Sequence, residues 1–108
     1  MTEIKINIKF KEYEFRRVKL MGTNPVIYTK KEWVNKEVII IPVPITVSDR
    51  WVETKYNNRT KKYDITIESD IILKKKVKKH SNIGRVYVPK DLIGLDCLVI
   101  EAPSFNNF

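Results

Sequence analysis

Residues 3–42 read EIKINIKFKEYEFRRVKLMGTNPVIYTKKEWVNKEVIIIP, and residues 62–101 read KYDITIESDIILKKKVKKHSNIGRVYVPKDLIGLDCLVIE. The two stretches align without a gap at an offset of 59 residues, and their apolar and charged positions stay in phase. Seven aligned pairs are identical: Ile6/Ile65, Ile8/Ile67, Val18/Val77, Lys19/Lys78, Tyr28/Tyr87, Lys31/Lys90 and Ile41/Ile100. A repeat of this length indicates a duplicated supersecondary unit. The sequence therefore predicts a pseudo-dimer within one chain.

The length of 108 residues is that of one domain. The overlay divides this domain into a first repeat at about 3–42, a connection at 43–61 and a second repeat at about 62–101. We expect the tail, residues 102–108, to be frayed at the chain terminus.

Short alternating segments predict a mainly β fold. Apolar residues occupy every second position of 4–10 and 63–67, which is the period of a strand with one buried face. Each repeat then continues in the same order. We expect a strand–turn–strand unit with its turn at 22–25 or 81–84, a short helical turn at 30–35 or 89–94, and a buried strand at 38–41 or 97–100. Asn35 and Gly94 suit the left-handed residue that ends a helical turn.

The connection allows more than one arrangement. Residues 45–47 form one candidate strand, and Ser48 is a candidate N-cap for a short helix. Alternatively, residues 51–56 and 61–67 form a hairpin that turns at Asn57 and Asn58, and the sequence favours this arrangement slightly.

Positive charge is concentrated in the strand–turn–strand unit of each repeat. The chain has 21 Lys and Arg, 13 Asp and Glu, and a formal net charge of +8. Residues 74–90 contain seven Lys or Arg and no acid, and residues 15–31 contain five and no acid. Such a distribution favours a polyanionic partner, and a two-lobed basic face matches duplex DNA. The simpler alternative is a pair of solvated edge strands, where lysine prevents aggregation.

The sequence indicates an intracellular, cytoplasmic protein without enzymatic activity. No segment has the roughly 20 apolar residues of a membrane span or the pattern of a signal peptide. The single cysteine, Cys97, excludes a disulfide within the chain and suits a small buried side chain. No catalytic motif or metal-ligand spacing is present, and we expect no cofactor, no metal and no catalytic residues.

The second repeat resembles a known family. Residues 77–94 read VKKHSNIGRVYVPKDLIG, which is similar to the pattern V-K-K-H-G-N-S-G-R-V-Y-V-P-K-E-W-I-G of small archaeal transposon-encoded proteins. These resemble the AbrB/MazE/SpoVT group. Two departures concern the turn, where Ser81 replaces a Gly and Ile83 replaces a Ser. The first repeat is linked to this family only by its alignment with the second repeat and by Lys31-Glu32-Trp33, which matches the K-E-W of the family pattern.

The resemblance implies a swapped-hairpin β-barrel, here built from two AbrB-like repeats in one chain. It also implies a transcriptional regulator of a mobile element or virus-like context, which binds double-stranded DNA as a monomeric pseudo-dimer or as a further homodimer. The expected DNA-binding residues are Lys75, Lys76, Lys78, Lys79, His80, Asn82 and Arg85, with Arg16, Arg17, Lys19 and Asn24 on the pseudo-symmetric side. The alternative is a protein-interaction module, either antitoxin-like or an inhibitor of a host factor. Its candidate surface is the connection, because the tail is short.

Overall fold

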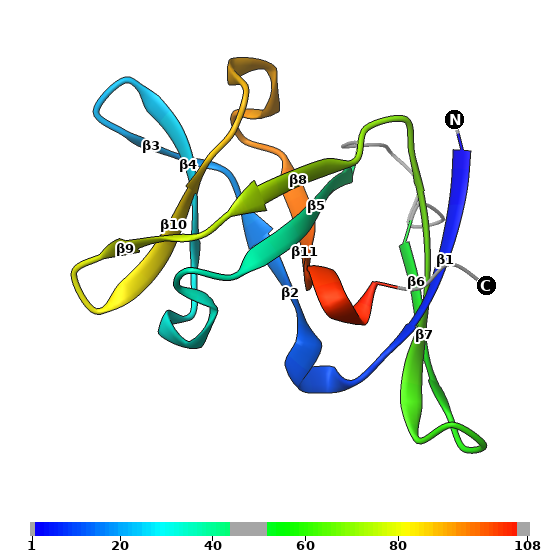
Figure 1. The fold of residues 1–108 in the computed structure, drawn as a ribbon. Helices are drawn as coiled ribbons and strands as arrows, with labels where there is room; N and C mark the ends of the chain where they lie inside the picture. The colour runs from blue at the N-terminus through cyan, green and yellow to red at the C-terminus, as the bar shows by residue number, and fades with distance from the viewer. Residues whose placement is uncertain (1, 44–51, 106–108) are drawn as a thin grey trace.

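A computed structural model describes residues 2–43 and 52–105, and these residues form a mainly β protein in three sheets (Figure 1). The first sheet has the order β1-β7-β6, with β1 Thr2–Ile8, β6 Val52–Asn57 and β7 Lys62–Ser69. The second has the order β2-β11-β5-β8, with β2 Tyr13–Arg17, β5 Glu37–Val43, β8 Leu73–Lys76 and β11 Asp96–Glu101. The third has the order β3-β4-β10-β9, with β3 Lys19–Met21, β4 Asn24–Thr29, β9 Lys78–His80 and β10 Ile83–Tyr87.

Short 3-10 turns connect several strands. They are η1 Phe10–Glu12, η2 Lys31–Trp33, η4 Lys90–Leu92 and η5 Ala102–Ser104. The expected helical turns are therefore confirmed, and Asn35 and Gly94 follow them with positive φ angles of 71° and 81°. In the part of the chain that the structure describes, no helix is long and apolar enough to cross a membrane.

The β2-β11-β5-β8 sheet is the middle layer, and its central strands β5 and β11 are buried on both faces. Along β5, Val38 and Ile40 point into one hydrophobic core, while Ile39 and Ile41 point into the other. Residues 97–100 of β11 divide between the same two cores in the same alternation. Their uninterrupted apolar runs in the sequence follow from this position, since a strand covered on both faces has no solvent side.

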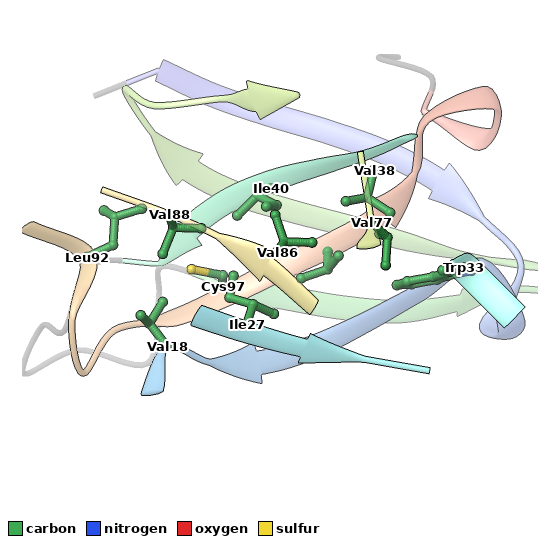
Figure 2. Packing of buried hydrophobic residues seen from close by; sticks show 11 residues of the cluster. Val18, Ile27, Trp33, Val38, Ile40, Val77, Val86, Val88, Leu92 and Cys97 are labelled. Atoms are coloured by element: carbon green, nitrogen blue, oxygen red, sulfur yellow. The ribbon is translucent and has the colours of Figure 1, made fainter. Parts of the chain in front are cut away.

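The first core lies between the middle sheet and the β3-β4-β10-β9 sheet (Figure 2). Ile27 of β4 and Val86 of β10 meet Cys97 and Ile40 there, and Trp33 of η2 is fully buried beside them. The second core joins the middle sheet to β1 and β7, whose isoleucines alternate with polar residues as the sequence indicated. The opposite face of β1-β7-β6 is polar.

Two chain segments pass from the middle sheet into the third sheet. β2 continues into β3 through Val18, and β8 continues into β9 through Val77, and both valines are buried in the first core. At these corners the backbone is hydrogen-bonded to other loops: Val18 N donates to Leu95 O at 2.9 Å, and Val77 N donates to Lys36 O at 2.9 Å. Strands that change sheets in this way form the corners of packed two-sheet structures.

Three central strand pairs share one numerical relationship. Ile6 pairs with Ile65 between β1 and β7, Ile27 pairs with Val86 between β4 and β10, and Ile40 pairs with Val99 between β5 and β11. In each pair the residue numbers differ by 59. The edge pairings also match at an offset of 59 residues. Arg17 faces Asp96, and the positions 59 residues away from these two, Lys76 and Glu37, face each other as well.

Several sequence expectations need correction. Hydrogen-bonded pairing among the described strands leaves three open sheets and closes none of them into a barrel. The strands β4 and β10 begin earlier than expected, so Asn24 and Pro25 belong to β4 rather than to the preceding turn, and Ile83 and Gly84 belong to β10. Apart from these corrections, residues 102–104 of the tail form η5, and Phe105 packs on the second core.

A hydrogen bond from Ser104 Oγ to the Glu12 carboxylate holds η5 against η1. The expected hairpin in the connection is confirmed as β6 and β7, with Asn57 Oδ1 accepting the backbone N–H groups of Arg59 and Thr60 in the turn. The alternatives at residues 45–47 and 48–52 fall outside the described residues, except for Val52, which begins β6.

Candidate nucleic-acid interface

The β3-β4-β10-β9 sheet has one face on the first core and one face away from it, which we call the outer face. Ile27 and Val86 mark the buried side, and alternation along the strands assigns their neighbours to the other side. Ten residues lie on this side of the strands, and none is acidic: Lys19, Met21, Asn24, Val26, Tyr28, Lys78, His80, Ile83, Arg85 and Tyr87. Val26 is the one among them that is fully buried.

Two cross-strand rows on the outer face bring the basic segments of both halves together. In one row, Lys19 and Tyr87 flank Val26. In the other, Tyr28 and Lys78 flank Arg85. The sheet therefore places residues of the first half directly beside residues of the second half on one surface.

Each row leads to a groove at the corner where the chain changes sheets. The β8–β10 groove, of about 250 Å³, is lined by Lys75, Lys76, Lys78, Arg85, Val86 and Tyr87. The β2–β4 groove, of about 240 Å³, is lined by Phe15, Arg16, Arg17, Lys19 and Tyr28. Four residues that line the β2–β4 groove have a counterpart 59 positions later in the lining of the β8–β10 groove. The pairs are Arg16/Lys75, Arg17/Lys76, Lys19/Lys78 and Tyr28/Tyr87.

The cations of the β8–β10 groove have no partners among the described carboxylates. No described acid forms an ion pair with Lys75, Lys76, Lys78 or Lys79, whereas nearby Lys74 pairs with Glu37 at 3.8 Å. Unpaired lysines on a sheet edge create a positive potential that attracts a polyanion.

The arginines of the β2–β4 groove are paired with acids. Arg16 forms an ion pair with Glu14, and Arg17 Nε donates to Asp96 Oδ1 at 3.1 Å. The hydrogen bond with Asp96 and the charge of that carboxylate raise the pKa of Arg17, which is already protonated at neutral pH. This groove is therefore less positive than the β8–β10 groove.

Arg85 is held from two sides on the outer face. Its Cζ lies 5.1 Å from the ring centroid of Tyr87, and its Nη1 lies 3.4 Å from Nδ1 of His80. The His80 ring in turn packs on Tyr28, with the centroids 5.5 Å apart. The Arg85 Nε is buried without a hydrogen-bond partner within the described part of the chain. This arrangement fixes the guanidinium at the centre of the outer face.

The structure separates some predicted site residues from the rest. Lys79 and Asn82 line a different hollow, of about 430 Å³, together with Lys31, Glu32, Val34, Ser81 and Ile83. Lys79 points to the opposite side of β9 from Lys78, and Asn82 is in the turn that follows β9. Asn24 belongs to the outer face but lies at its far end, opposite Met21.

The sequence prediction missed the aromatic residues of this surface. Tyr28 and Tyr87 were visible as an identical pair in the overlay, and each alternates with core residues in a strand, which marks a side chain on the outer face. Phe15 is 41% exposed and Tyr87 is 40% exposed. Partly exposed rings among cations are a feature of nucleic-acid-binding sheets.

Neither metal chemistry nor a reactive thiol is seen at this surface. Within residues 2–43 and 52–105, no group of three or more His, Cys, Asp or Glu side chains is arranged to hold a metal ion. Burial, with a smaller contribution from Asp96, raises the pKa of Cys97 to about 12, so the thiol stays protonated inside the first core.

Comparison with known proteins gives no relative: no protein-family model, curated protein or solved structure matches this chain.

Proposed function

We propose that this protein binds duplex DNA through the outer face and its two flanking grooves. The observation that carries the proposal is the acid-free outer face together with the β8–β10 groove beside Arg85, which is lined by lysines without described acidic partners. Lysines bind phosphates as flexible point charges. A duplex offers about one phosphate charge per 1.7 Å of its axis, so a surface with cations at both ends can bind several phosphates.

Within this proposal Arg85 reads a base. A guanidinium fixed in orientation is suited to bidentate contact with guanine, which supplies about 1–3 kcal/mol of discrimination. Lys75, Lys76 and Lys78 bind the phosphate chain on one side. Arg16, Arg17 and Lys19 do so on the other side, more weakly because acids partly neutralise the arginines.

The proposal includes an origin for the fold. We infer that the chain is a single-chain pseudo-dimer of two AbrB-like swapped-hairpin units, acting as a cytoplasmic transcriptional regulator of a mobile element or virus-like context. The shared 59-residue offset of the pairs Ile6/Ile65, Ile27/Val86 and Ile40/Val99 supports duplication. Light scattering on the purified chain tests this architecture. We expect a folded monomer, and an obligate dimer would contradict the proposal that one chain completes the unit.

An electrophoretic mobility shift with a salt series tests DNA binding. We expect log K to fall linearly with log salt, because each phosphate contact releases counterions. The double variant Lys75→Gln/Lys78→Gln removes two such contacts, so the slope becomes shallower by about 1.8. The matched control is Lys5→Gln/Lys55→Gln on β1 and β6, which removes the same charge from the other outer sheet. An equal effect of both double variants would mean that net charge alone binds DNA.

One observation favours a protein partner as the second candidate. Five rings form a continuous chain of contacts that begins at Phe15 in the β2–β4 groove and leads away from the outer face: Phe10, Tyr13, Phe15, Tyr56 and Tyr63. Phe10 is 70% exposed and Tyr56, in the connection between the halves, is 50% exposed. Loss of DNA binding by the outer-face variants, with no effect of Phe10→Ser, would separate the two surfaces.

A further inference from the structure

We propose that the outer face also binds single-stranded nucleic acid, with an unpaired base stacked on Tyr28 and another on Tyr87. This inference rests on the proposed nucleic-acid site and extends it to a second ligand class. Its starting point is that each groove contains a tyrosine as well as cations, at equivalent positions of the two halves.

In size and in lining residues, each groove suits the binding of one nucleotide. Their volumes of about 240 and 250 Å³ lie below the roughly 300–1,000 Å³ of pockets for drug-sized ligands, so each admits a small planar group. The ring supplies a surface for a base, and the lysines beside it supply a site for the attached phosphate. Single-strand-binding proteins combine these same two elements.

Both tyrosines stay partly exposed, although Tyr87 packs on Arg85 and Tyr28 packs on His80. In a duplex the base faces are hidden in the stack, so contacts with phosphates and base edges leave this exposed ring surface unused. Tyr87 nevertheless remains 40% exposed at the centre of a charged sheet. Phe15, which is 41% exposed, adds a second ring to the β2–β4 groove.

The spacing of the two tyrosines suits one chain. Tyr28 faces Arg85 and Tyr87 faces Val26, so the tyrosines are diagonal neighbours on paired antiparallel strands. Such neighbours lie about 7–8 Å apart, roughly twice the 3.4 Å step between stacked bases in one strand. A chain that crosses the face with its bases unstacked from each other therefore reaches both rings. Arg85 lies between them and neutralises the intervening phosphate.

Fluorescence anisotropy with the 108-residue chain at low salt tests this inference. The probes are labelled (dT)12, an abasic 12-mer with the same number of phosphates, (rU)12 and a 12-base-pair duplex. We expect (dT)12 to bind more tightly than the abasic chain by about 5- to 150-fold for each stacked base. Comparison of (rU)12 with (dT)12 shows whether the unpaired bases belong to RNA or to DNA.

The double variant Tyr28→Leu/Tyr87→Leu keeps apolar side chains in the strands and removes the rings. We expect it to lose the preference for (dT)12 over the abasic chain, because the lysine–phosphate contacts that both chains share do not depend on the rings. Tyr56→Leu, at an exposed tyrosine of β6, is the matched control. Equal affinity of the unmodified protein for (dT)12 and the abasic chain would overturn the inference but leave duplex binding intact. Binding to none of the four probes would overturn the proposed function as well.

Discussion

Arg17 in β2 is hydrogen-bonded to Asp96 in β11, its register partner, with Nε 3.1 Å from Oδ1. At the corresponding place in the second half, Lys76 faces Glu37, but the ion pair of Glu37 is with Lys74 at 3.8 Å. One corner of the protein therefore has a neutralised cation, where the other has a cation without an acidic partner among the described residues. This difference makes the two grooves electrostatically unequal.

Replacement of Asp96 by Asn should strengthen nucleic-acid binding. The change releases Arg17 for a phosphate and removes a negative charge from the rim of the β2–β4 groove. The slope of log K against log salt should steepen by about 0.9, the value for one added phosphate contact. Stability should change little, because the pair is exposed.

Glu53→Gln is the matched control for Asp96→Asn. It frees Lys55 on β6, whose ion pair with Glu53 is 2.7 Å long, and adds the same net charge on the other outer sheet. An unchanged slope for Asp96→Asn would remove Arg17 from the interface.

Arg85→Ala should weaken binding and reduce the preference among duplex sequences. The change removes the one guanidinium that Tyr87 and His80 hold at the centre of the outer face. A loss of about 1–3 kcal/mol is expected on a preferred site, with a smaller loss on other sequences. Competition binding on a randomised duplex pool measures both quantities. A uniform loss on every duplex would assign Arg85 to phosphate contact alone.

Gly84→Ala should be strongly destabilising. A Cβ at this position of β10 would lie 2.4 Å from Val77 Cγ1 and 2.5 Å from Thr29 Oγ1, so the corner through Val77 must move. Overpacking of this kind costs about 1–3 kcal/mol, occasionally more. Urea unfolding measures the change in the free energy of unfolding.

Gly22→Ala is the control for this substitution. Nothing lies within 4 Å of its added Cβ, but its φ of +64° is unfavourable for alanine. We expect a cost of about 1 kcal/mol from the backbone alone. If Gly84→Ala lowered the free energy of unfolding no more than Gly22→Ala does, β10 could not pack against the corner at Val77 as closely as described.

Stability should fall above pH 9 because of Cys97. Burial raises the pKa of its thiol from 9.0 to about 12, so the folded state keeps the proton that the unfolded state loses. The contribution is constant below pH 9 and declines by about 1.4 kcal/mol per pH unit between pH 9 and 12. Denaturant unfolding from pH 7 to 11 should show this decline relative to Cys97→Ala. Parallel curves for the two proteins would contradict it.

The sequence predicted the elements of this fold better than their assembly. The apolar runs 38–41 and 97–100 identified the buried strands, and local turn chemistry identified Asn35, Gly94 and the hairpin at Asn57, because these features depend on neighbouring residues alone. Even Ser81, which replaces a glycine of the resembling pattern, has the positive φ of 54° that this turn requires.

The assembly depends on contacts between distant residues, and these have no local signal. That the chain passes from one sheet to another at Val18 and Val77 was not predicted, because a buried valine looks the same in a straight strand. The docking of Phe105 depends on a core built by β1, β5, β7 and β11. At the candidate site, charge patterning found the lysines, whereas the tyrosines became noticeable only when the sheet placed them beside Arg85.

The three central pairs have a consequence for how this protein can evolve. In a symmetric homodimer, a residue on the twofold axis meets its own copy, so any change in size occurs twice at the same contact. Here Ile27 meets Val86 and Ile40 meets Val99, so a larger side chain on one strand is matched by a smaller one on its neighbour. A single gene that encodes both sides of each contact can therefore accept substitutions one at a time, and its two grooves can come to differ in their residues.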